Sequence, residues 1–148
     1  MFFVLVAIAI IAVSLAIYVY FFLPKTLSSA ETADKLSSLN SRARGILLLM
    51  ADDMLNWANG TITTTTFTTR MITKKSDMTN LRNELLDLKN VADPSYAMSI
   101  NLLDMGYQDY ITALGYAFNL DFNLTSQYIV RGTNYLTQAE NAIPKVQH

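Results

Sequence analysis

Residues 36–57 read LSSLNSRARGILLLMADDMLNW, and their apolar side chains recur with the spacing of a helix buried along one face. Steps of three and four residues separate them, as in helices that pack in bundles. This seam consists of Leu36, Leu39, Ala43, Ile46, Met50, Met54 and Trp57. The apolar run from Ile46 to Met50 widens the face, so we expect deep burial there. Asn59 and Gly60 tolerate a left-handed backbone, so we expect the helix to cover residues 27–58.

The same spacing recurs three times after Gly60 and predicts helices at about residues 70–92, 95–118 and 121–143. Asp93 and Pro94 suit the N-cap and first helical residue of the middle one. Few residues separate the last two helices, which should therefore be antiparallel neighbours. We expect residues 25–148 to form an all-α, up-down antiparallel bundle of four helices. The seam residues after Gly60 are Met71, Met78, Leu81, Leu85, Leu88, Ala92, Tyr96, Ile100, Leu103, Tyr107, Tyr110, Leu114, Ala117, Phe122, Thr125, Ile129, Gly132, Leu136, Ala139 and Ile143.

A threonine-rich segment joins the first two predicted helices. Residues 61–69 read TITTTTFTT, with seven threonines and no charge. Threonine is stiff at χ1 and favours an extended backbone. We expect residues 60–69 to form an exposed loop. An O-glycosylated patch and a strand added to a neighbour's sheet edge are the alternatives.

Upstream of the bundle, residues 2–23 read FFVLVAIAIIAVSLAIYVYFFL and carry no charge. As a helix this stretch is about 33 Å long, enough to cross the hydrocarbon core of a bilayer. Its length, and the absence of Lys or Arg before it, argue against a cleaved signal peptide. We expect a single transmembrane helix at residues 1–24, nearly continuous with the first bundle helix beyond a bend at Pro24. Small residues that allow another helix to approach closely share one face of it: Ala9, Ala12 and Ala16.

Charge and composition restrict the partners. The net charge is −1 and no basic cluster occurs, so nucleic acid is not an expected partner. Cysteine is absent. Counted literally, the positive charges after the apolar stretch place the bundle in the cytoplasm, but long domains cross membranes regardless of such charges. The abundance of Thr, Ser and Asn favours an extracytoplasmic bundle. Candidate glycosylation sequons begin at Asn59 and Asn123, but about two sequons are expected by chance in a sequence of this composition.

Catalytic chemistry has few candidates in this sequence. The only histidine is His148, so an internal histidine base, a Ser-His-Asp triad and a histidine–carboxylate metal site are excluded. Several carboxylates lie on the predicted helices, and we expect solvated surface charges at Asp52, Asp53, Glu84, Asp87, Asp104 and Asp109. Asp53 differs from the others because it lies seven residues after Ile46, where the seven-residue (heptad) repeat of the seam places a buried residue. We predict no enzyme, no catalytic residue, no cofactor and no metal site.

Aromatic residues are concentrated in the last two predicted helices. A tyrosine at a seam edge buries its ring and leaves its hydroxyl in water, which is ordinary bundle packing. Because tyrosine is also favoured at interfaces, the candidate partner contacts are Tyr116, Tyr128 and Tyr135. A pocket for a flat apolar ligand is an alternative use of the same residues. Close approach of helices, or of a partner's backbone, is favoured at Gly106, Gly115 and Gly132.

The first part of the chain resembles the spine helix of type IV pilins. The resemblance covers roughly residues 1–57 and rests on the apolar N-terminal helix, Pro24 near its end and the amphipathic continuation. It implies a filament core in place of lipid around the apolar helix. The sequence departs from the pilin pattern at its fifth residue, which is Leu5 where pilins have Glu, and it has no processing-type leader. Its remainder is predicted to be helical, whereas such pilins usually carry a sheet. No functional residue is carried over.

Three functions are consistent with these features. The leading one is a non-enzymatic, single-pass membrane-anchored helical protein that acts as an accessory or structural subunit of a larger membrane complex. Its partners would be membrane lipid and other membrane-protein subunits or copies of itself. The alternatives are a pilin-like surface filament subunit and an extracytoplasmic sensor or binding domain for a small apolar ligand.

Overall fold

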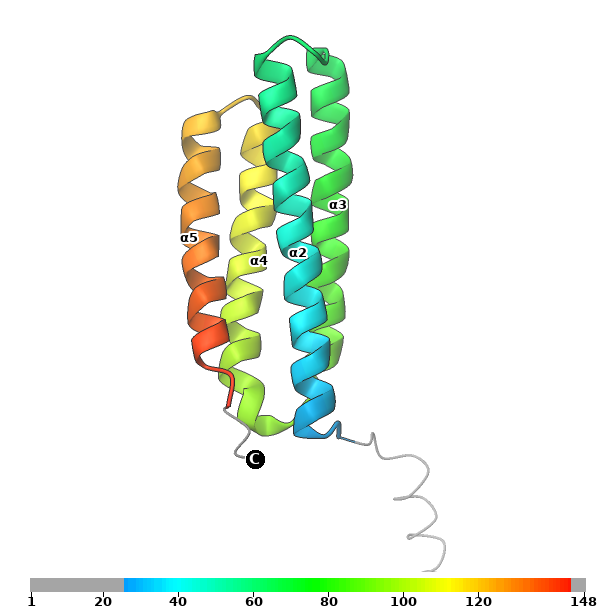
Figure 1. Cartoon of the computed structure of the whole chain (residues 1–148), viewed down its shortest axis with the longest axis vertical. Coiled ribbons are helices and arrows are strands. Elements are labelled where there is room, and N and C mark those ends of the chain that lie inside the picture. Colours follow the sequence, from blue (N-terminus) through cyan, green and yellow to red (C-terminus); the bar gives the residue numbers. More distant parts are fainter. Residues whose placement is uncertain (1–25, 145–148) are drawn as a thin grey trace, which may run out of the picture.

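The computed structural model describes residues 26–144, which form four α-helices and one short 3-10 helix. In chain order these are α2 (Ser29–Ala58), α3 (Thr64–Lys89), η1 (Pro94–Tyr96), α4 (Ala97–Phe118) and α5 (Phe122–Asn141). Consecutive α-helices lie side by side and run in opposite directions (Figure 1). Within the described residues there is no strand. The predicted all-α helical bundle is therefore confirmed for this part of the chain.

The predicted transmembrane helix at residues 1–24, with Ala9, Ala12 and Ala16, lies outside the described residues. Among the helices of residues 26–144, none combines the length and apolar character that membrane crossing requires.

α2 begins with a capping box. The Ser28 hydroxyl accepts a hydrogen bond from the Glu31 amide, and the Glu31 carboxylate accepts one from the Ser28 amide at 2.9 Å. These bonds from Ser28, the backbone one foremost, lower the pKa of Glu31. Residues 26–28 are not helical. We expected α2 to be nearly continuous with a helix before Pro24. This expectation is wrong for residues 26–28, because the capping box makes α2 begin at Ser29.

The core is a single cluster of side chains from all four α-helices. Every predicted seam residue from Met71 to Ala117 is buried, and the predicted seams of α2 and α5 are buried or half-buried against the same cluster. The widened face of α2 is a different matter. Leu48 and Leu49 are 72% and 60% exposed, so the deep burial expected from Ile46 to Met50 holds only for Met50.

α3 begins at Thr64, so the loop expected at residues 60–69 is wrong beyond residue 63. The Thr63 hydroxyl caps the helix by accepting a hydrogen bond from the Thr66 amide at 3.1 Å. Phe67 is fully buried and packs against the rings of Trp57 and Phe122, at centroid distances of 5.6 and 6.1 Å. Burying a phenylalanine contributes roughly 2–3 kcal/mol, which exceeds the helix penalty of a few threonines.

Both tight turns at the upper end of Figure 1 use a residue with positive φ. Gly60 has φ 70°, the left-handed backbone that was predicted at the end of α2. The Thr61 amide donates a hydrogen bond to the Asn56 carbonyl at 2.8 Å. After α4 the same position is occupied by Leu120, with φ 62°. A leucine there bears a steric penalty that glycine avoids.

α4 and α5 approach closely because two glycines face each other. A Cβ on Gly106 would lie 3.1 Å from the Gly132 carbonyl oxygen, and a Cβ on Gly132 would lie 3.0 Å from the Gly106 carbonyl oxygen. The close helix approach predicted for these two residues is confirmed.

At the lower end of Figure 1, the start of α2 is tied to the connection between α3 and α4. The Leu27 amide donates to the Val91 carbonyl at 2.6 Å, and the Asp93 amide donates to the buried Thr32 hydroxyl at 3.1 Å. Asp93 is the N-cap of η1 as predicted, and its carboxylate also accepts a hydrogen bond from the Ser29 hydroxyl.

Candidate functional site

Two of the three tyrosines predicted as partner contacts stack at the bundle surface. The rings of Tyr116 on α4 and Tyr128 on α5 have centroids 5.4 Å apart. The guanidinium carbon of Arg131 lies 4.5 Å from the Tyr128 ring centre, at the distance of a cation–π contact. Tyr135 forms no aromatic pair with any described residue and is half-buried. The structure thus joins Tyr116 and Tyr128 and leaves Tyr135 out of the stack.

Asp109 holds Arg131 in this position. The guanidinium donates two hydrogen bonds to the carboxylate, at 2.6 Å from Nε and 2.5 Å from an Nη atom. The hydrogen bonds from Asp109 raise the pKa of Arg131 above its ordinary value. Asp109 is buried, so the expected solvated surface charge is wrong at this position. A bidentate pair fixes the plane of the guanidinium and lets it lie over the tyrosine ring.

A second surface was not expected from the sequence. Leu48 and Leu55 of α2, here called the leucine face, are 72% and 60% exposed, whereas Leu49, also 60% exposed, lies on the side of α2 toward α3. Beside the leucine face runs a groove of about 350 Å³ between α2 and α5, floored by Tyr110 of α4. Further along, the Glu140 carboxylate bridges the two helices by accepting from Asn40 at 2.7 Å and Arg44 at 2.5 Å. The signal was present in the sequence, since the residues from Ile46 to Met50 are more apolar than one seam requires.

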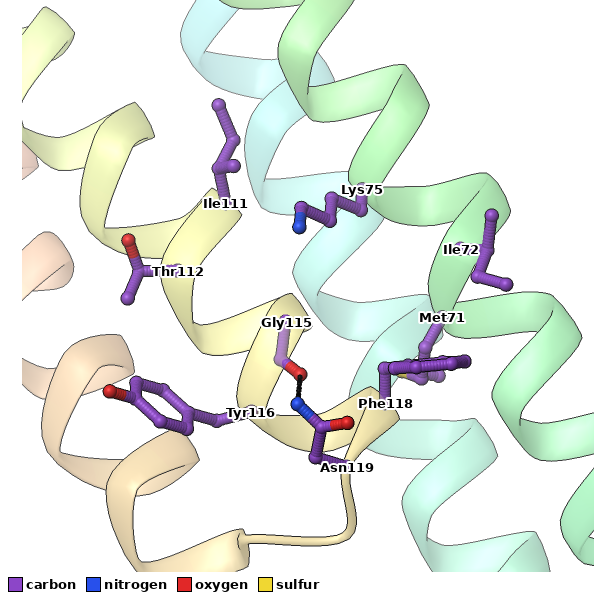
Figure 2. Close-up of a pocket in the computed structure, with 9 residues that line it drawn as sticks. All are labelled: Met71, Ile72, Lys75, Ile111, Thr112, Gly115, Tyr116, Phe118 and Asn119. Atoms are coloured by element: carbon purple, nitrogen blue, oxygen red, sulfur yellow. Dashed lines mark hydrogen bonds between the residues drawn. The ribbon is translucent and has the colours of Figure 1, made fainter.

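A third surface is a groove of about 610 Å³ between α3 and α4 (Figure 2). It is lined by Met71, Ile72, Lys75, Ile111, Thr112, Gly115, Tyr116, Phe118 and Asn119. Figure 2 shows Lys75 extending from α3 across the groove toward α4. Tyr116 belongs both to this groove and to the tyrosine stack.

Asp53 is a buried carboxylate between α2 and α3. It is 4% exposed and accepts hydrogen bonds from Lys74 and, at 2.6 Å, from Arg70. Burial raises the pKa of this carboxyl, but the hydrogen bonds from Lys74 and Arg70 outweigh it and leave the pKa below its ordinary value. The expected solvated charge is therefore wrong here as well, while the seam position of Asp53 is confirmed. Its two cations make it a structural ion pair, because both carboxylate oxygens are occupied.

Of the remaining predicted positions, Asp104 is half-buried and the others are exposed. Asn59 caps the end of α2 and Asn123 lies in the first turn of α5, and both are exposed. Their glycosylation stays a prediction. Glu84 and Asp104 pair with Arg42 and Arg82, each at 2.6 Å.

Among residues 26–144, no three carboxylate or histidine side chains gather as a metal site would require. Comparison of the chain with protein-family models, with curated proteins and with solved structures finds no match.

Proposed function

We propose that this protein is a non-enzymatic, single-pass membrane-anchored subunit whose helical bundle acts by associating with other membrane-protein subunits or with copies of itself. The observation that carries the proposal is the leucine face, with Leu48 at 72% and Leu55 at 60% exposure. These two side chains lie seven residues apart and therefore on one side of α2. Exposed apolar patches on a folded domain are typical of protein interaction sites.

The attachment of the bundle supports the anchored arrangement. The apolar stretch at residues 2–23 is suited to lipid, and it precedes an α2 start that is fastened to the bundle by Leu27 and Thr32. The exposed Asn59 and Asn123 are compatible with the proposed extracytoplasmic location.

The test is affinity purification of the full chain in mild detergent, with partner stoichiometry measured by quantitative mass spectrometry. The variant carries Leu48→Ser and Leu55→Ser. The matched control is Met98→Ser, because Met98 is 67% exposed on α4, away from the leucine face. Exposed substitutions of this kind change the free energy of unfolding by about 0.5 kcal/mol or less, so both bundles should stay folded.

We expect partners at fixed stoichiometry with the wild type and Met98→Ser, and their loss with the leucine variant. A wild-type chain that purifies with no partner and no second copy would contradict association, as would a leucine variant that retains every partner. Detergent-free filaments containing the chain after shearing would instead establish the filament alternative.

A further inference from the structure

Lys75 is a cation that the bundle does not use. All five arginines of the described residues form ion pairs, and so does Lys74. The Lys75 ammonium makes neither an ion pair nor a hydrogen bond with any residue in the range 26–144, and only the backbone carbonyl of Lys75 accepts a side-chain hydrogen bond, from Thr79. The ammonium nevertheless extends across the α3–α4 groove (Figure 2).

Gly115 lies opposite Lys75, and helix packing does not account for it. A Cβ at Gly106 or Gly132 would lie within 3.1 Å of the carbonyl oxygen of the other glycine and closer still to a side chain, that of Leu136 or Tyr110 respectively. A Cβ at Gly115 would meet only the Lys75 Nζ, at an ordinary contact distance of 3.5 Å. Glycine inside a helix costs about 1 kcal/mol relative to alanine. The missing side chain at this position leaves room in the groove in front of the ammonium.

The other groove residues define an apolar site with one positive charge. Ile72 is 57% exposed and Phe118 is 40% exposed. Two polar side chains of the groove are engaged locally, since Thr112 donates to the Gln108 carbonyl at 2.9 Å and Asn119 to the Gly115 carbonyl at 3.1 Å. None of the nine lining residues is acidic. The volume, about 610 Å³, falls in the usual range for small-molecule sites.

We propose that the α3–α4 groove binds a linear alkyl carboxylate, with the alkyl chain along the apolar walls and the carboxylate paired with Lys75. A single cation matches a single negative charge, and a phosphate dianion would keep half of its charge unpaired. The segments that line the groove, residues 71–75 of α3 and 111–119 at the C-terminal end of α4, lie toward the end of the bundle opposite the start of α2 (Figure 1). In the anchored arrangement proposed above, this end of the bundle faces away from the bilayer, so we take the ligand to be a free carboxylate in solution and not a bilayer lipid. This site does not depend on the leucine face.

The test uses the full chain in nanodiscs of zwitterionic lipid, with ¹³C-labelled methionine methyl groups observed by NMR during titration with octanoate. Met71 lines the groove and reports binding. Met98 and Met105 are exposed on α4 outside the groove and report adsorption to the surface. The buried Met50 and Met78 report that the bundle is intact. We expect a saturable shift of Met71, with the methyl groups of Met50, Met78, Met98 and Met105 unchanged.

Three substitutions test whether the positive charge at position 75 contributes to binding. Lys75→Gln should weaken octanoate binding about tenfold, because it removes a charge-assisted hydrogen bond. Lys75→Arg should retain binding, and Lys89→Gln, the same charge change elsewhere on α3, should leave it unaltered. Octanol should bind the wild type about as weakly as octanoate binds Lys75→Gln.

Four results would overturn the proposal. They are the absence of a saturable Met71 shift, equal shifts at Met98 and Met105, equal affinity of octanoate for wild type and Lys75→Gln, and equal affinity of octanol and octanoate. A Met71 shift on replacing the zwitterionic lipid by an anionic one, without octanoate, would overturn the free source and identify a bilayer lipid as the occupant.

Discussion

Among the carboxylates of α2, Asp53 is the one that forms ion pairs with described residues, namely Arg70 and Lys74. The heptad pattern placed it at the seam, and there it lies, buried with two cations from α3. The pairing itself was not predictable, because Lys74 and Arg70 become partners only once the register between α2 and α3 is set. A heptad identifies the face of a helix and says nothing of its register with the next one.

Asp53→Asn should lower the free energy of unfolding by about 3 kcal/mol at neutral pH, because Lys74 and Arg70 lose their counter-charge. The pKa of Asp53 is lowered in the folded state, so its stabilisation is complete above the unfolded pKa of about 3.9 and is lost as pH falls through the folded pKa. The difference between wild type and variant should therefore shrink in acid below about pH 4. Urea unfolding of the two proteins across this pH range measures it.

The adjacent Asp52 provides the control for this prediction. It is exposed and accepts only from the Asn56 side chain, at 3.0 Å. Asp52→Asn should change stability by about 0.5 kcal/mol or less at every pH. Equal effects of the two substitutions would show that the ion pair with Lys74 and Arg70 does not form.

At the scale of the helices, apolar spacing predicted which residues are buried and failed where two local signals competed. Threonine favours an extended backbone, yet Phe67 lies four residues before Met71 and continues the α3 seam. Its burial extends the helix back to Thr64. On α2 the opposite error arose, since Leu48 and Leu49 are apolar enough for a core but face outward. An apolar residue that a partner covers is indistinguishable, in one sequence, from one that the chain itself covers.

Gly106 and Gly132 lie where the helices pack tightly, whereas Gly115 has room for a side chain. Gly132→Ala should lower the free energy of unfolding by about 1–3 kcal/mol, because the new methyl group meets the Gly106 carbonyl and the Tyr110 ring. Gly115→Ala should instead raise it by about 1 kcal/mol through helix propensity. Urea unfolding of both variants decides the sign of each effect.

Gly45→Ala is the matched reference for this pair. Gly45 lies inside α2, and no atom lies within 4 Å of a Cβ built on it. Its substitution should therefore stabilise the bundle by an amount similar to that of Gly115→Ala. A stabilising Gly132→Ala would show that α4 and α5 do not cross at these glycines.

For the whole molecule, the number of helices and their up-down order followed from four amphipathic stretches with short connections, but the arrangement of the surfaces did not. α2 and α5 flank a groove floored by α4, and a seam pattern cannot reveal how far the first and last helices stand apart. Tyr116 and Tyr128 were named as partner contacts, which stays a prediction, whereas their stacking and the contact of Arg131 with Tyr128 were not predicted. The groove beside Lys75 could not be predicted, because residues of both α3 and α4 line it and the sequence does not show which of them lie opposite each other.

Anchoring is the property of the whole chain on which the proposed function rests. The fifteen Phe, Leu, Ile and Val residues of the stretch 2–23 favour insertion by roughly 5–9 kcal/mol in total, and one central arginine opposes it by about 3 kcal/mol. One substitution is thus too weak a test. Ile11→Arg with Leu15→Arg offsets most of the total, so the double variant should appear in the supernatant after carbonate extraction, while wild type and the surface control Ser126→Arg stay in the pellet. A double variant that still resists carbonate would mean that something other than lipid, such as a filament core or a partner subunit, retains the chain.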